Sequence, residues 1–115
     1  RYCSLVAAAE DDPVPCLGLL LLGYPLRPAG KPHAPARSEH FARIRVPVLF
    51  VSGTRDALAA RDALEAEARA VRGPISFHWI EGGDHSFKVP ARIGRPQGEV
   101  LDEVAGASAA WVVAF

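Results

Sequence analysis

Residues 47–56 read PVLFVSGTRD and carry the strongest strand signal in the chain. The apolar part combines β-branched and aromatic side chains, which suit a strand, and a proline at the first position of a strand costs no ladder hydrogen bond. Gly53 ends the run and Asp56 follows within three residues. The stretch therefore predicts a strand over residues 47–52 with a carboxylate just beyond its carboxyl end.

Two other stretches predict strands on either side of it in the chain. Residues 16–22 read CLGLLLL, a continuous apolar run that suits a strand buried on both faces in a parallel sheet, although leucine would equally suit a helix. Residues 75–80 alternate large apolar residues with smaller or polar ones, as expected nearer a sheet edge. The first of these strands needs a second neighbour, and the chain offers no obvious candidate.

Helical patterns separate the strands. Residues 2–10 are rich in helix-forming alanine, and residues 59–72 predict an amphipathic helix that stops at a Gly-Pro pair. A short helical piece is expected over residues 38–44, and a last helix has an apolar stripe from Val100 to Phe115. The order predicts an α/β fold with about three parallel strands flanked by helices.

Composition excludes several classes of protein. The 13 basic residues balance the 13 acidic ones, so the chain lacks the one-sign field that attracts nucleic acid or anionic lipid. No apolar run approaches the ~20 residues of a membrane helix. Cys3 and Cys16 lie in apolar stretches, where we expect buried, reduced thiols and hence a cytoplasmic protein. The expected partner is a small-molecule substrate.

Reactive side chains follow two of the predicted strands. Asp56 comes after the strand over residues 47–52, and His85 follows residues 75–80 in the sequence EGGDH. Ligands of open parallel sheets bind beyond the carboxyl ends of the strands, where we expect both side chains to meet. A carboxylate on one imidazole nitrogen fixes the tautomer, so that the other nitrogen can take a proton at neutral pH. Asp56 and His85 are therefore the candidate catalytic residues.

The spacing of these segments resembles that of the α/β-hydrolase superfamily. More narrowly, the sequence LLLLGYPL at residues 19–26, with Gly30-Lys31-Pro32, resembles the dienelactone-hydrolase-like branch, which includes the hydrolase-like domain of the NSL chromatin complex. The resemblance implies a partial α/β-hydrolase fold that acts on ester, thioester or lactone-like bonds. It also implies a nucleophile in a Gly-x-Ser-x-Gly elbow upstream of the acid and the histidine.

No such elbow occurs in the 115 residues, which also contain no methionine. We therefore expect residues 1–115 to be the C-terminal part of a single domain that lacks its N-terminal half and is inactive alone. Two stretches imitate the elbow. Ser108 follows no strand and comes after the histidine. Cys3, in Arg1-Tyr2-Cys3-Ser4-Leu5, resembles the cysteine elbow of dienelactone hydrolases but has Arg1 and Leu5 where that family has glycines.

Other candidate site residues are few. Tyr24 follows the first strand and is a candidate for lining a substrate pocket. The alternative, which we favour, is that its aromatic ring packs inside the protein. We expect no metal site and no cofactor, because the four histidines are scattered and show no ligand spacing.

Two other functions remain open. The chain could be a non-catalytic pseudo-hydrolase or interaction module. It could also be a phosphate binder that uses Gly53-Thr54-Arg55, but no glycine-rich loop opens a helix there. In either case the first strand predicts an exposed sheet edge through which the chain could self-associate.

Overall fold

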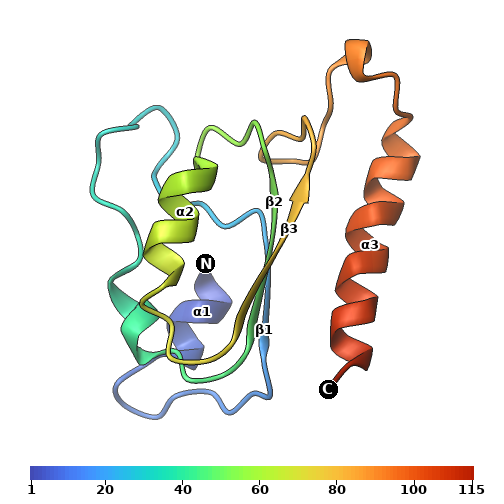
Figure 1. The fold of residues 1–115 in the computed structure, drawn as a ribbon. Helices are drawn as coiled ribbons and strands as arrows, with labels where there is room; N and C mark the ends of the chain where they lie inside the picture. Colours follow the sequence, from blue (N-terminus) through green and yellow to red (C-terminus); the bar gives the residue numbers. More distant parts are fainter.

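The computed structural model describes residues 1–115 and contains a three-stranded parallel sheet with helices on both faces (Figure 1). Its elements are α1 (Tyr2–Ala7), β1 (Leu19–Leu22), the 3₁₀ helix η1 (Glu39–Arg43), β2 (Val48–Gly53), α2 (Arg61–Ala68), β3 (Ile75–Ile80), the 3₁₀ helix η2 (Ala91–Ile93) and α3 (Gln97–Val113). α1, η1 and α2 lie on one side of the sheet, and α3 lies on the other. The predicted α/β class and three parallel strands are confirmed.

The strands follow the order β1-β2-β3, so β2 is central and the other two are edges. All six residues of β2 are buried, whereas β3 is mostly half-buried. The expectation that the first strand is buried on both faces is wrong for these residues, whereas its open outer edge agrees with the exposed sheet edge that the sequence predicts. β1 covers only Leu19–Leu22, no strand pairs with its outer edge, and the Leu22 side chain is 50% exposed.

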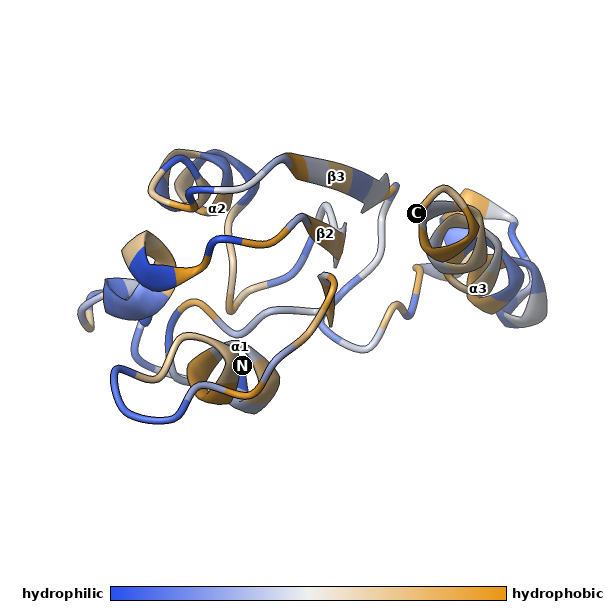
Figure 2. Cartoon of the chain, turned by 90° about the horizontal axis from the view of Figure 1, so that it is seen from below, coloured by the Kyte–Doolittle hydropathy of each residue, from blue (hydrophilic) through white to orange (hydrophobic).

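Two apolar cores lie on opposite faces of β2. Because side chains alternate along a strand, Val48 and Phe50 point into a cluster of 13 buried residues beneath α1, η1 and α2. Leu49 and Val51 point the other way, toward Ile80 and the buried face of α3. Figure 2 shows this division from below, with α3 standing apart from the other helices. The continuous apolar run of β2 is what burial on both faces requires.

Only the first half of α3 is firmly packed. Val100 and Val104 of its apolar stripe are buried, and Glu103 lies 2.7 Å from the His78 imidazole of β3. That contact, together with an ion pair to Arg95, lowers the pKa of Glu103. Toward the end of the helix the stripe reaches the surface, where Phe115 is 59% exposed.

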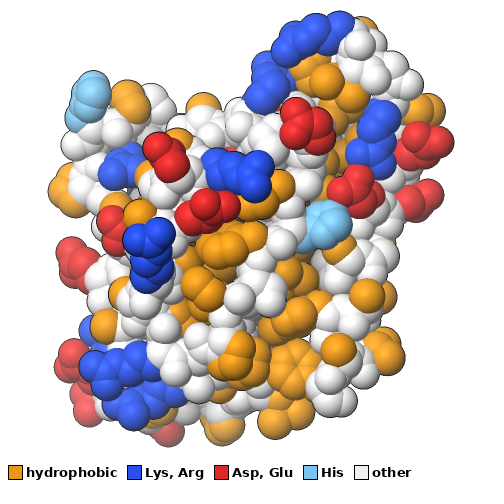
Figure 3. All heavy atoms as spheres, in the orientation of Figure 1, with side chains coloured by type: hydrophobic (Ala, Val, Ile, Leu, Met, Phe, Trp, Pro, Cys, Tyr) orange, Lys and Arg blue, Asp and Glu red, His pale blue; other side chains and the backbone are white.

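Several large apolar residues are exposed on the surface. Figure 3 shows apolar side chains gathering in the middle and lower part of one face, between the positions that α2 and α3 hold in Figure 1. The large hydrophobic residues with exposed side chains are Tyr2, Val14, Leu17, Leu22, Leu101, Val112, Val113 and Phe115. A helix such as α3, with apolar residues on several faces, is the kind that proteins normally bury.

Several local expectations are corrected. α1 ends at Ala7, and α2 is shorter than the predicted 59–72 because its last turns are irregular. Cys3 and Cys16 are both exposed free thiols, not buried ones, because α1 and the loop that follows it place them on the surface. None of the helices combines the length and the apolar character needed to cross a membrane.

Candidate active site

Asp56 is held rigidly in the turn that follows β2. Its backbone N–H donates to the Gly53 carbonyl at 3.2 Å, which closes the turn. The side chain is completely buried, and Oδ1 accepts a hydrogen bond from the Leu58 amide at 2.8 Å. A buried carboxylate needs such partners, because an unpaired charge in the interior is costly. Oδ2 is left to face the loop after β3.

His85 is presented by a closed turn after β3. Asp84 organises this turn: its Oδ1 accepts from the amides of Ser86 and Lys88 at 2.8 and 2.9 Å, and its own amide donates to the Lys88 carbonyl. The hydrogen bond from the Lys88 amide, together with the one from the Ser86 amide, lowers the pKa of the Asp84 carboxyl. Phe87 takes the left-handed φ of +62° that closes the turn.

The two loops bring the acid and the imidazole into contact. Nδ1 of His85 lies 2.9 Å from Oδ2 of Asp56. An ionised carboxylate can only accept hydrogen bonds, so Nδ1 carries the proton and Nε2 is the basic nitrogen of the neutral ring. Nε2 has no hydrogen-bond partner, and the side chain is 40% exposed. The arrangement can take a proton from a group placed beside Nε2.

Hydrogen bonds lock the two loops to each other. The Thr54 hydroxyl accepts from the buried Gly82 amide at 2.7 Å, and the Thr54 amide donates to the Ile80 carbonyl at 3.0 Å. The Arg55 amide donates to the Gly83 carbonyl at 2.8 Å. Sequence reasoning did not assign this role to Thr54. A hydroxyl residue directly after a strand-ending glycine was the only signal.

The glycines of the two loops are needed for different reasons. Gly82 has a φ of +74°, a left-handed conformation that glycine adopts without strain. Gly53 instead allows a close approach, because a Cβ on it would lie 2.0 Å from the Gly83 carbonyl oxygen. Turn geometry therefore accounts for Gly82, and close approach of the two backbones accounts for Gly53.

Tyr24 lies in the core and lines no cavity of this structure. It is 1% exposed, and its hydroxyl donates to the Arg37 carbonyl at 2.6 Å. Its ring packs edge-on against Phe41 and Phe50, and burial raises the pKa of its phenol. The packed arrangement, which the sequence favoured over pocket lining, is the one observed.

Ser4 and His40 form a buried serine–histidine contact apart from the Asp56–His85 pair. Ser4 Oγ lies 2.8 Å from Nε2 of His40, and both residues are buried. The Ser4 hydroxyl donates to the Arg1 carbonyl at 2.7 Å, so it accepts from Nε2. That direction is the reverse of what a nucleophile and its base need. Burial lowers the pKa of His40, which keeps the ring neutral, and we assign the pair to the packing of α1 against η1.

Ser108, the serine that imitates an elbow, is part of a helix. The Ser108 hydroxyl donates to the Val104 carbonyl at 2.7 Å, one turn back in α3. No cluster of three or more potential metal-ligating side chains occurs in the structure.

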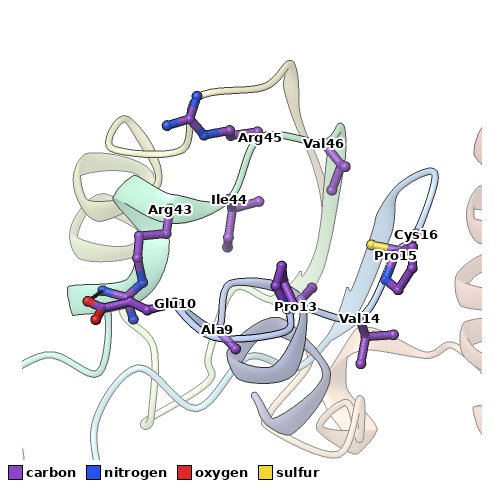
Figure 4. Close-up of a pocket in the computed structure, with 11 residues that line it drawn as sticks. Ala9, Glu10, Pro13, Val14, Pro15, Cys16, Arg43, Ile44, Arg45 and Val46 are labelled. Carbon is purple, nitrogen blue, oxygen red and sulfur yellow. Dashed lines mark ion pairs between the residues drawn. The ribbon is translucent and has the colours of Figure 1, made fainter.

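One of the largest cavities, of about 510 Å³, is drawn in Figure 4, and neither Asp56 nor His85 lines it. It is lined by the loop after α1, by Arg43 at the end of η1 and by the residues between η1 and β2, among them Val14, Cys16 and Val46. These residues precede β1 and β2, so the cavity is at the amino ends of the strands. Ligands of parallel sheets bind at the carboxyl ends, where the acid and the imidazole lie.

Comparison with known families agrees with the architecture. A family model described as an alpha/beta hydrolase domain matches residues 1–113. No solved structure gives a significant match to the chain.

Proposed function

The chain belongs to the alpha/beta hydrolase domain family, and we propose that it supplies the base and the acid of a serine-type catalytic triad. His85 is the general base and Asp56 is the residue that orients it. The observation that carries the proposal is the 2.9 Å contact between Nδ1 and Oδ2, with Nε2 free and partly exposed. A buried carboxylate that holds one imidazole nitrogen, while the other faces outward, is the arrangement that proton transfer requires.

The nucleophile comes, in this proposal, from a Gly-x-Ser-x-Gly elbow outside residues 1–115. Nε2 of His85 takes the hydroxyl proton as the oxygen attacks a carbonyl carbon of the substrate. Asp56 stabilises the imidazolium that forms. The ring then returns the proton to the departing alcohol or thiol, which leaves an acyl-enzyme, and a water activated by the same nitrogen hydrolyses it. The substrates are small molecules with an ester, thioester or lactone-like bond.

A narrower assignment rests on residues around β1. The Gly-Tyr-Pro-Leu element at residues 23–26 supports the dienelactone-hydrolase-like branch and its relation to the NSL hydrolase-like domain. We place the activity in the cytoplasm, because Cys3 and Cys16 form no disulfide and thiols stay reduced in that compartment.

The test uses the longer protein that contains these residues together with a nucleophile elbow. It should hydrolyse a short-chain p-nitrophenyl ester, and His85→Ala should lower kcat by more than about 10³-fold. Asp56→Asn should lower kcat by up to about 10⁴-fold, because the wrong imidazole tautomer is then favoured. His33→Ala is the matched control, since His33 is exposed. Full activity in the His85 variant would rule the proposal out.

The competing function is a non-catalytic pseudo-hydrolase or interaction module. It is favoured by the apolar side chains that remain exposed on β1 and at the end of α3, such as Leu22 and Phe115. The nucleophile position separates the two functions. If the longer protein has no serine or cysteine in its elbow and no esterase activity, the module is the correct assignment.

A further inference from the structure

Gly23, the first residue after β1, lies directly against His85. A Cβ on Gly23 would sit 3.0 Å from the His85 carbonyl oxygen and 3.6 Å from both Nδ1 and Cε1 of its ring. Gly23 is buried and has a left-handed φ of +63°. The Nδ1 and Cε1 atoms of the imidazole therefore lie beside a residue that has no side chain.

The position of Gly23 is itself fixed by the central strand. Its amide donates to the Val51 carbonyl at 2.8 Å, which continues the β1–β2 ladder one residue beyond Leu22. The carboxyl end of β1 is thus anchored beside the strand that leads to Asp56. Each of the three strands ends at the site: β2 leads to the acid, β3 leads to the imidazole, and β1 leads to the glycine against which the imidazole lies.

We propose that Gly23 is a positioning residue for His85, one that allows the imidazole to reach Asp56. The inference rests on the proposed function, because positioning matters for catalysis only if His85 is the base. A side chain at Gly23 would need the His85 backbone to move by a few tenths of an ångström, since 3.0 Å is shorter than nearly all real contacts of a Cβ. The Nδ1–Oδ2 distance is now 2.9 Å, and a hydrogen bond weakens as its length and angle depart from the optimum.

The chain offers a matched control for this contact. Gly30 lies in the same loop between β1 and η1 and has a φ of +72°, but a Cβ on it would meet nothing within 4 Å. Gly23→Ala and Gly30→Ala therefore impose the same kind of backbone strain. Only Gly23→Ala also places its new Cβ against His85.

The readout is the Nδ1 proton of His85, observed by NMR in the 115-residue chain with ¹⁵N-labelled histidine. A proton held in a hydrogen bond to a carboxylate resonates far downfield and exchanges slowly. We expect this signal in the wild-type chain and in Gly30→Ala, and its loss or a clear upfield shift in Gly23→Ala. His85→Gln assigns the signal, because it removes it.

A second variant guards against misfolding. Gly23→Asn adds the same Cβ, but asparagine tolerates a left-handed φ better than alanine does. An unchanged Nδ1 signal in either folded Gly23 variant would overturn the inference, as would an equal change in Gly30→Ala. If both Gly23 variants fail to fold while Gly30→Ala folds, Gly23 serves folding and not positioning, which also overturns it.

The result is independent of the proposed function. The NMR signal reports the contact between His85 and Asp56 whether or not the protein hydrolyses esters. If Gly23→Ala leaves the signal intact while His85→Ala abolishes hydrolysis in the longer protein, only the positioning role fails. If the signal is lost in Gly23→Ala while hydrolysis survives in His85→Ala, the contact is real and the proposed function fails. If both the positioning role of Gly23 and the catalytic role of His85 are correct, Gly23→Ala should lower kcat of the longer protein by about ten- to a hundredfold.

Discussion

Thr54→Val tests whether one side-chain hydrogen bond holds the acid loop to the histidine loop. The Thr54 hydroxyl accepts from the Gly82 amide at 2.7 Å, across 28 positions of the chain. Valine has nearly the same shape as threonine but cannot accept a hydrogen bond. The substitution therefore leaves the packing unchanged and the buried Gly82 amide without its partner.

The magnitude follows from the burial of the two groups. A buried donor without a partner costs about 1–3 kcal/mol. Gly82 is buried but Thr54 is half-buried, so water can reach part of the site and the lower half of that range applies. We expect a loss of about 1–2 kcal/mol, which for a urea slope of about 2 kcal/mol/M moves the unfolding midpoint down by about 0.5–1 M.

The assay is equilibrium unfolding in urea, followed by tryptophan fluorescence and by circular dichroism. Thr54→Ser is the control, because it keeps the hydroxyl and loses one methyl group, at a cost below about 1 kcal/mol. The unfolding slope should stay the same in all three proteins. A valine variant as stable as wild type, or a serine variant as unstable as the valine one, would refute the reasoning.

Three further predictions concern other parts of the fold. Burial keeps the pKa of His40 below its ordinary 6.5, so the unfolded chain takes up a proton first and stability falls as the pH drops below about 6.5. Glutamine can still donate a hydrogen bond to Ser4 but does not titrate. The urea midpoints at pH 7 and pH 5 should therefore differ less in His40→Gln than in wild type. Gly53→Ala should destabilise the chain by about 1–3 kcal/mol, because the added Cβ would lie 2.0 Å from the Gly83 carbonyl oxygen. Gly106 lies in α3, where an added Cβ meets nothing, so Gly106→Ala should raise stability by up to about 1 kcal/mol in the same assay. Leu22→Lys should reduce any self-association seen by sedimentation velocity, since a lysine opposes pairing along an open strand edge, and equal association in both proteins would exclude that edge as the contact.

The candidate site was largely accessible from the sequence because its parts follow strands. Asp56 and His85 each come a few residues after a stretch with a strong strand signal, and parallel strands place such residues at one end of a sheet. Their contact at 2.9 Å agrees with that expectation, while their catalytic role stays a prediction. Tyr24 follows a strand too, but its side chain packs into the core, because the sequence does not say to which face a residue in an irregular loop turns.

Contacts between backbones could not be predicted in the same way. The approach of Gly53 to Gly83, and that of Gly23 to the His85 ring, depend on how closely two loops pass each other. A glycine in a sequence indicates only that some close approach or left-handed turn is possible there. The buried contact between Ser4 and His40 was also missed, because the two residues are 36 positions apart and belong to no recognisable pattern.

The sequence by itself determined the class of fold, since the period and composition of each segment reflect the faces that the segment must bury. It determined β2 most clearly, because the unbroken apolar run over Val48–Val51 is what burial on both faces of a sheet favours. Only the tertiary structure decided that Cys3 and Cys16 are exposed, and that the acid loop, the histidine loop and Gly23 interlock. Burial and close approach are properties of segments in contact, and a local pattern contains no record of which segments will meet.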